Sequence, residues 1–261
     1  MNSLYMMSEV KVLVFSLVLI RMISFIVASP VFGSAQISAH AKVLLCVTLA
    51  ICLFPSIPVD SKVYDGLTND LISLAGREVL VGISLGFFSR MFFYTVSMAG
   101  QLISNSIGLS AGQMFNPLLG SPGNIIEQFY SILGMLFFFM VNGHHMLIGA
   151  LAQSFDFIKV GQLRFNMGAF SEVALFGQTI LLITVKMCAP VLVAILLSQV
   201  SLGLLGRAIP QMNVLVTSFP VTVMLGLGVM IICIPLYMNG LNNLIEVVAV
   251  NLLQLMKGIN V

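Results

Sequence analysis

Residues Val173–Leu205 read VALFGQTILLITVKMCAPVLVAILLSQVSLGLL, and this stretch decides the class of fold. It contains one charged residue, Lys186, and it exceeds the roughly 20 mostly apolar residues that a helix needs to cross a bilayer. Five further stretches have the same character: Val10–Phe32, Ala41–Ile57, Leu71–Met98, Ile125–Val141 and Val214–Tyr237. The sequence therefore predicts an all-α, membrane-associated fold.

Several of these stretches depart from the length or regularity of a simple span. Ala41–Ile57 is short and ends near Pro55 and Pro58, whereas Val173–Leu205 is too long and contains Pro190. Proline inside a helix removes a hydrogen bond and predicts a kink or a break. A further apolar piece, Met146–Phe157, is too short to span a bilayer alone. Kinked helical hairpins are therefore expected.

Composition excludes several classes of protein. The chain has 261 residues, of which 59% are hydrophobic and 8% are charged. Soluble domains average about 25% charged residues, so this chain lacks the polar side chains for a fully solvated surface. The net charge of +2 leaves no basic footprint for nucleic acid. The length suits one domain that covers residues 1–261.

Five charged residues lie inside the predicted helices: Arg21, Arg77, Glu78, Arg90 and Lys186. Each would cost about 2.5–3.5 kcal/mol at the centre of a bilayer, so these side chains should face protein, water or lipid headgroups. Arg77 and Glu78 are adjacent in sequence, so on a helix their side chains point about 100° apart. They therefore need separate partners. The charges either form ion pairs that hold helices together or line a polar path.

The segment between Arg90 and Glu127 has no charged residue but many amide and hydroxyl side chains. Its second half, Gly108–Gly123, reads GLSAGQMFNPLLGSPG and contains two prolines. Irregular backbone at membrane depth is tolerated only inside protein or beside water. The segment is therefore predicted to be an irregular internal loop, and the alternative is a simple connection within a helical hairpin.

Glycine spacing predicts close helix packing. Gly82 and Gly86 stand four residues apart in one predicted helix, and Gly108 and Gly112 have the same spacing at the start of the loop. Small residues at this spacing allow helix backbones to approach each other closely. The pattern is common in membrane helices and favours assembly without naming a partner.

The sequence lacks recognisable catalytic equipment. It contains no GxxxxGK[ST] phosphate loop, no GxSxG nucleophile motif and no HExxH metal motif. Its four cysteines lie in apolar runs without a CxxC pair, and His144 and His145 are adjacent, so they face different directions. Neither an enzyme, nor a metal site, nor a cofactor is expected.

The stretch Gly203–Val214, GLLGRAIPQMNV, is followed by Phe219-Pro220 and by Gly226-Leu-Gly228. Taken alone, it predicts a helical hairpin with a stiff, polar tip, because Pro210 forces an extended turn. The stretch resembles the signature region of the FliR/SctT family of type III export-gate subunits, and its wording is closer to flagellar members. Weaker resemblances begin near Arg21 and Glu78. One departure is that Val221-Thr222-Val223 has no charge where family members often carry a lysine.

The resemblance implies a non-catalytic role in a helical, hetero-oligomeric gate. This gate would lie in the bacterial inner membrane, within the flagellar basal body. It implies P-type and Q-type gate subunits, a B-type switch protein and unfolded export substrates as partners, with no nucleic acid. Residues up to about 170 would be the P-type-like part, and residues 171–261 the Q-type-like hairpin. A small-molecule secondary transporter is the alternative, and an intramembrane hydrolase would lack its nucleophile.

The resemblance also assigns expected roles to residues. The uncharged loop 108–123 would plug the export conduit through Gly108, Gly112, Gln113, Met114, Phe115, Asn116 and Pro117. The buried charges, the glycine spacing and the signature motif together predict residues that pack between subunits: Arg77, Glu78, Gly82, Gly86, Arg207, Pro210, Gln211 and Asn213.

Overall fold

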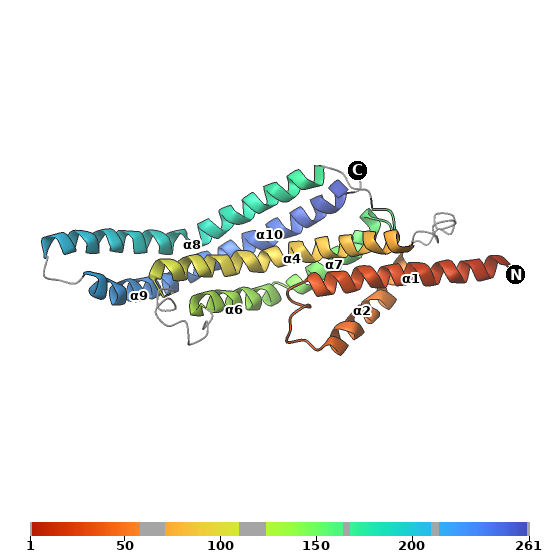
Figure 1. Ribbon diagram of the computed structural model, residues 1–261, viewed down its shortest axis with the longest axis horizontal. Helices are drawn as coiled ribbons and strands as arrows, with labels where there is room; N and C mark the ends of the chain where they lie inside the picture. The colour runs from red at the N-terminus through yellow and green to blue at the C-terminus, as the bar shows by residue number, and fades with distance from the viewer. Residues whose placement is uncertain (1, 58–70, 110–123, 164–167, 210–213, 260–261) are drawn as a thin grey trace. The chain divides into compact units, whose positions relative to one another are not determined.

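The computed structural model describes residues 2–57, 71–109, 124–163, 168–209 and 214–259 (Figure 1). Every regular element in these ranges is a helix, which confirms the predicted all-α fold. The helices are α1 (Asn2–Ala28), α2 (Ala39–Leu53), η1 (Phe54–Ser56), α4 (Leu71–Ile107), α6 (Ile125–Met140), α7 (Gly143–Phe157), α8 (Gly168–Ala208), α9 (Val214–Ile232) and α10 (Ile234–Ile259).

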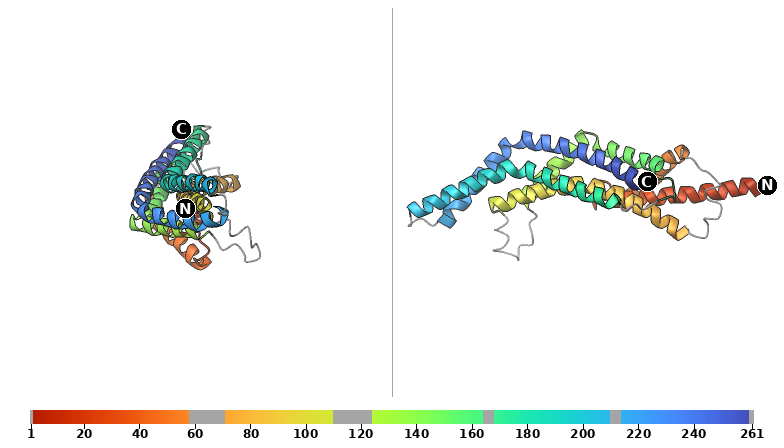
Figure 2. Two further views of the ribbon diagram at one scale, coloured as in Figure 1. Left: turned by 90° about the vertical axis from the view of Figure 1, so that its left-hand side faces the viewer. Right: turned by 90° about the horizontal axis from the view of Figure 1, so that it is seen from above.

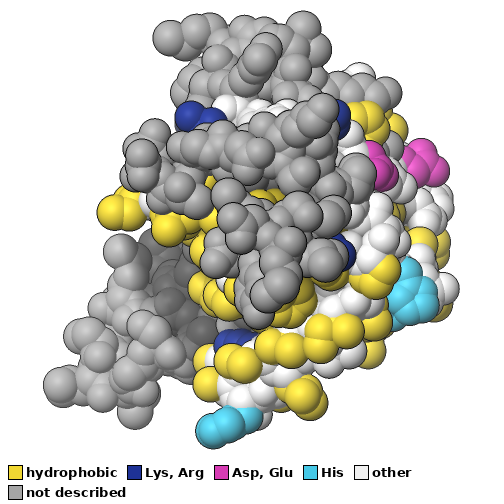
Figure 3. All heavy atoms as spheres, turned by 90° about the vertical axis from the view of Figure 1, so that its right-hand side faces the viewer, with side chains coloured by type: hydrophobic (Ala, Val, Ile, Leu, Met, Phe, Trp, Pro, Cys, Tyr) yellow, Lys and Arg dark blue, Asp and Glu magenta, His cyan; other side chains and the backbone are white. Residues whose placement is uncertain are grey.

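The helices have the length and the surface of a membrane protein. Within the described ranges, four are long and apolar enough to cross a membrane, or up to six if each of two bent pairs is one span. Large hydrophobic side chains are exposed along them, including Ile72, Leu136 and Met224. The face in Figure 3 shows hydrophobic side chains at the surface among few charged ones. The chain is therefore membrane-associated.

The helical structure extends beyond the predicted apolar stretches in two places. The helix predicted to end at Met98 continues as α4 to Ile107, because the polar segment still buries Ile103 and Ile107. Most of α10 lies outside the predicted apolar stretches, since asparagines interrupt its apolar run. Its apolar residues recur at helical spacing and form one buried face, which contains Tyr237, Leu241, Leu244, Val248 and Leu252.

Prolines affect the helices in different ways. Pro55 lies in η1 directly after α2, whereas Pro58 is outside the described residues. α8 runs continuously through Pro190 and changes direction part-way along its length (Figure 1). The predicted span Val214–Tyr237 is broken at Cys233, just before Pro235, and the two sides differ by 59° in direction. The prediction of kinked helices is thus confirmed.

The chain forms two compact units that interleave along the sequence. Unit 1 contains Met1–Met91, Asn142–Leu175 and Val248–Val261, and unit 2 contains Phe92–Val141 and Phe176–Val247. The predicted division near residue 170 into a P-type-like part and a Q-type-like part stays a prediction.

In unit 1, α1 packs against α2 and against the first part of α4. Phe15 meets Phe54 edge to face at 5.5 Å between ring centroids. The core of this unit is completed by α7, and its buried side chains include Val14, Val18, Met22, Phe25, Leu74, Val81, Leu147 and Leu151.

In unit 2, the second part of α4 packs against α6 and α9. An aromatic cluster joins Phe92 and Phe93 of α4 to Phe138 of α6, at centroid distances of 5.5 and 5.3 Å respectively. The later part of α8 and α9 lie side by side as an antiparallel hairpin in Figures 1 and 2. The sequence predicted this hairpin from Pro210 and its neighbours.

Candidate functional site

A buried ion pair joins α1 and α4 in the core of unit 1. Arg21 Nε donates to Glu78 Oε2 at 2.5 Å, and Arg21 Nη2 donates to Glu78 Oε1 at 3.1 Å. The Arg21 side chain is fully buried and that of Glu78 is 1% exposed. This fork-like pairing matches the planar guanidinium to the carboxylate and is the strong form of a charged hydrogen bond.

The remaining donors of Arg21 bind the end of α7. Nη1 donates to the backbone oxygen and the hydroxyl of Ser154, at 3.2 and 3.1 Å, and Nη2 also donates to the backbone oxygen of Ile158 at 3.1 Å. The guanidinium carbon lies 4.2 Å from the centroid of the Phe155 ring. Because a guanidinium has five N–H donors, these contacts use every donor of this buried cation.

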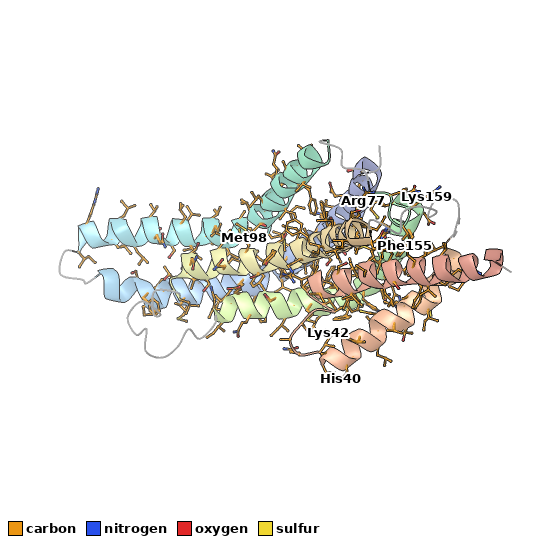
Figure 4. The ribbon with its side chains drawn as sticks, turned by 45° about the vertical axis from the view of Figure 1, so that its right-hand side comes forward. His40, Lys42, Arg77, Met98, Phe155 and Lys159 are labelled. Atoms are coloured by element: carbon orange, nitrogen blue, oxygen red, sulfur yellow. The ribbon has the colours of Figure 1, made fainter. Side chains whose placement is uncertain are left out.

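The turn after α7 binds Arg77 and Glu78, which are neighbours in sequence. The Gly161 N–H donates to Glu78 Oε1 at 2.7 Å, and Arg77 Nη1 donates to the Gly161 oxygen at 3.0 Å. Gly161 has a φ of +77°, a conformation that favours glycine. In Figure 4, Arg77 of α4 lies close to Phe155 and Lys159, which come from α7 and the residues just after it.

We call Arg21, Glu78, Ser154, Ile158 and Gly161 the Arg21–Glu78 cluster. It connects three segments that are far apart in sequence, and each charged group in it is hydrogen-bonded. For Arg21 and Glu78, this confirms the alternative in which buried charges hold helices together. Arg77 and Glu78 have separate partners, as predicted: Arg77 binds the Gly161 oxygen, whereas Glu78 binds Arg21 and the Gly161 N–H.

Gly82 and Gly86 allow the backbones of α4 and α1 to touch. A Cβ atom on Gly82 would lie 2.6 Å from the backbone oxygen of Arg21, and one on Gly86 would lie 3.0 Å from the backbone carbon of Ala28. This confirms that the glycine spacing brings helix backbones together. The contact is within the chain, and a role of these glycines between subunits stays a prediction.

The two ends of the predicted plug loop are described in unit 2. Gly108 ends α4 with a φ of +90°, and its N–H donates to the backbone oxygens of Ser104 and Asn105. At the other end, the Asn124 side chain accepts a hydrogen bond from the Glu127 N–H at 3.4 Å, which caps the start of α6. Both helix ends next to the loop are therefore capped by local hydrogen bonds.

A side-chain bond ties α6 to α4 near these ends. Ser97 Oγ donates to Glu127 Oε1 at 2.5 Å. A Cβ on Gly100 would lie 2.8 Å from the Glu127 Cα, and one on Gly134 would lie 2.8 Å from Val96 Cγ1. α4 and α6 are thus in close contact along the hairpin that carries the loop.

Several predicted site residues lie outside the described residues: Gly112, Gln113, Met114, Phe115, Asn116, Pro117, Pro210, Gln211 and Asn213. Arg207 is exposed in the last turn of α8. Arg90 is partly exposed in α4, whereas Lys186 is exposed on α8. The roles predicted for the plug and the hairpin tip therefore stay predictions.

Sequence reasoning missed Ser154, Ile158, Gly161 and the Ser97–Glu127 bond. The contacts at Ile158 and Gly161 use backbone atoms only, which any residue supplies, so the identity of Ile158 gives no signal in the sequence. Among the described residues, no group of three His, Cys, Asp or Glu side chains is arranged to hold a metal ion. The chemistry of the described clusters is that of tight helix packing.

Comparison with known proteins identifies the family. Residues 12–248 match the family described as bacterial export proteins, family 1. The chain belongs to this family of bacterial export proteins. The matched region includes every residue for which a plug or packing role was predicted, and family membership confirms the resemblance drawn from the motif around Arg207.

Relatives with the name flagellar biosynthetic protein FliR cover most of this bacterial export protein. The relative from Bacillus subtilis (strain 168) is 31% identical over 222 residues, which cover 84% of this chain and 85% of the relative. The relative from Escherichia coli (strain K12) is 28% identical over 219 residues, covering 84% and 83%. The relative from Aquifex aeolicus (strain VF5) is 29% identical, covering 85% and 86%.

Proposed function

We propose that this chain is a subunit of the flagellar type III protein export gate and forms part of the conduit for unfolded export substrates. The observation that carries the proposal is the similarity to FliR proteins across 84% of the chain. The proposed location is the flagellar basal body in the bacterial inner membrane. Nothing in the comparisons favours the alternative of a small-molecule secondary transporter.

The surface supports membership of an assembly. Apolar side chains are exposed along α8 and α9, including Leu197, Leu204 and Met224. Lipid or neighbouring proteins must cover such a surface. The proposed neighbours are P-type and Q-type gate subunits, with a B-type switch protein on the cytoplasmic side. The proposed role is structural and needs neither catalysis nor a cofactor.

Co-expression tests the assembly directly. We expect the chain to aggregate or to elute broadly in mild detergent when it is expressed alone, because its exposed apolar helices lack partners. With the P-type and Q-type subunits it should elute as one defined complex. The measurement is size-exclusion chromatography with mass determination of the eluted species. A monodisperse monomer that the other subunits leave unchanged would contradict the proposal.

We further propose that the loop 108–123 plugs the conduit. Its flanks support this role, because Gly108 and Asn124 are held in capped helix ends and Ser97 binds Glu127 between the two helices. The loop sequence has no charge, and Met114 and Phe115 are bulky apolar residues at its centre. Apolar constrictions hold back ions by excluding water.

Replacing Met114 and Phe115 by glycine should therefore make the resting gate leaky. We expect cells with this double variant to take up a small fluorescent dye or ions several times faster than cells with the unchanged chain. Dye uptake is compared in cells whose complex levels match, as quantified by immunoblotting of purified complexes.

The matched control replaces Phe129 and Ile132 by glycine, since both are exposed on α6 outside the loop. This control should not raise permeability in intact complexes. Unchanged dye uptake in the Met114/Phe115 variant, with the complex intact, would reduce the loop to a structural connection.

A further inference from the structure

Gly226 and Gly228, which follow the motif around Arg207, have different surroundings in α9. Gly226 is buried, whereas Gly228 is exposed. A Cβ atom on Gly226 would lie 2.6 Å from both Cγ1 and Cδ1 of Ile107. One on Gly228 would meet no atom within 4 Å apart from its chain neighbours and the adjacent backbone of α9. Carbon atoms of two side chains pack at about 3.5–4.0 Å, so position 226 has no room for a side chain unless Ile107 moves.

Ile107 is the last residue of α4, the helix that leads into the loop 108–123. Its side chain is 1% exposed, and that of Ile103, about one turn earlier, is fully buried. Gly108 follows directly with a φ of +90°, and its N–H donates to backbone oxygens in the last turn of α4. Within unit 2, α9 therefore covers the point at which the chain leaves α4.

α9 makes a second contact at this point. A Cβ atom on Gly108 would lie 3.9 Å from Cδ2 of Phe219, which is an ordinary packing distance. Phe219, Thr222 and Gly226 follow one another in steps of three and four, so they lie along one side of α9. We call these three residues the α9 stripe. Thr222 is 6% exposed, and its hydroxyl lies 3.0 Å from the backbone oxygens of Ser218 and Phe219, so it is bonded within α9.

Ion pairs cannot fix the loop 108–123, because its sequence contains no charged residue. The helices at its two ends are both packed. At the far end, Asn124 caps α6, and α6 touches α4 where a Cβ on Gly100 would lie 2.8 Å from the Glu127 Cα. At the near end, the chain continues from Ile107, which lies against Gly226. A shift of Ile107 would therefore change where the loop begins.

We propose that Gly226 is a positioning residue for the loop 108–123, because the absence of a side chain at 226 seats Ile107 and fixes the end of α4. The inference rests on the proposed function, in which this loop is the plug. It gives the α9 stripe a role distinct from that of the hairpin tip. If Gly226 served only to pack α9, enlarging it would lower the amount of complex without raising the permeability of the complexes that form.

Gly226→Val should displace the end of α4 and make the resting gate leaky. Valine would place carbon atoms where the Ile107 side chain lies. At matched complex levels, we expect dye uptake several times faster than with the unchanged chain. In the purified complex, amides in the last two turns of α4 should exchange about tenfold faster or more, the usual scale of overpacking. Gly228→Val is the matched control in the same helix, and it should change neither measurement.

A rescue variant tests whether Ile107 is the cause. Gly226→Val with Ile107→Ala keeps the number of side-chain carbon atoms and removes both atoms that the new Cβ would meet. The Ile107 Cβ, which alanine keeps, would lie at an ordinary 3.6 Å. Because volume-conserving changes are tolerated best, dye uptake should return to within about twofold of the unchanged chain. Uptake as fast as in Gly226→Val alone would overturn the proposal.

A smaller change keeps the test decisive if Gly226→Val yields no complex. Gly226→Ala adds only the carbon atom that would meet Ile107, and Gly228→Ala is then its control. Dye uptake should again rise for the change at 226 alone. Equal uptake in the two alanine variants, with intact complex, would contradict the positioning role.

The outcomes distinguish this inference from the proposed function. The variant with glycine at Met114 and Phe115 is measured in parallel. If neither it nor Gly226→Val raises permeability, the proposed plug fails, and the inference fails with it. If the loop variant leaks while Gly226→Val does not, the plug stands and the positioning role of Gly226 is wrong. Equal leakage in Gly228→Val and Gly226→Val would also overturn the inference.

Discussion

Glu78→Ala is expected to destabilise unit 1 by about 3–5 kcal/mol, the usual effect of removing one partner from a buried ion pair. Arg21 would lose two of its five hydrogen bonds while its side chain remained buried and charged. The Gly161 N–H would also lose its acceptor. The loss should therefore affect α1, α4 and the turn after α7 together.

Hydrogen exchange of the purified complex measures this effect locally. Amides of α1 and of the first part of α4 should exchange about a hundredfold faster or more, since each 1.4 kcal/mol corresponds to a factor of ten. Glu246→Ala is the matched control, because Glu246 is exposed on α10, and the change should alter stability by no more than about 0.5 kcal/mol. Equal exchange in the two variants would contradict a stabilising role of the Arg21–Glu78 cluster.

A double variant tests the physical reason. Arg21→Met with Glu78→Leu removes both charges and leaves neither one unpaired. Replacing a buried ion pair by apolar side chains of similar size is often neutral or stabilising. We therefore expect the double variant to exchange more slowly than Glu78→Ala. If it is as unstable as the single variant, hydrogen bonds to Ser154 and Ile158, rather than charge pairing, determine the stability of the cluster.

Gly86→Leu is expected to separate α1 from α4 and to destabilise unit 1 by about 2–3 kcal/mol, within the usual range for overpacking. The first carbon of any side chain at Gly86 would lie 3.0 Å from the backbone carbon of Ala28. Backbone atoms cannot rotate away, so one helix must move. A leucine would add three further carbon atoms in the same direction.

Gly76→Leu is a control within the same helix. Gly76 is exposed, and a Cβ there would have no atom within 4 Å apart from its chain neighbours and the adjacent backbone of α4, so nothing opposes the first carbon of a leucine side chain. Replacing a helical glycine also favours the helix by up to about 1 kcal/mol, and this variant should be as stable as the unchanged chain or more stable. The temperature at which the complex loses this chain, followed by native gel electrophoresis, should fall for Gly86→Leu alone. A similar fall for both variants would show that the contact with Ala28 is not the cause.

Local pattern and composition determined the class of fold. Water is absent at membrane depth, so the backbone N–H and C=O groups must form hydrogen bonds with each other. A long, continuous apolar run does this by forming a helix. This is why the sequence predicted the helices around Val10–Phe32 and Val173–Leu205. The same reasoning missed α10, whose Asn239, Asn242 and Asn243 interrupt the apolar run while Tyr237 and Leu241 still bury one face.

Local pattern also determined where close packing was needed and where the family could be recognised. Gly82 and Gly86 predicted a close contact between helix backbones, because a residue without a side chain lets another helix approach closely. This holds whether the other helix belongs to the same chain or to another subunit. The motif around Arg207 indicated the family from a dozen residues. Neither signal named the partner of a glycine or of a charge.

Only the tertiary structure decided which groups meet. Arg21 and Glu78 are 57 positions apart, and Arg21 and Ser154 are 133 positions apart. The sequence required partners for these charges but left pairing and polar-path alternatives open, since many groups could satisfy them. The polar end of α4 became helix because packing buries Ile103 and Ile107. Which side chains pair across long distances in the sequence depends on how whole helices pack against one another. A sequence pattern indicates only which residues are neighbours within a few turns of the same helix.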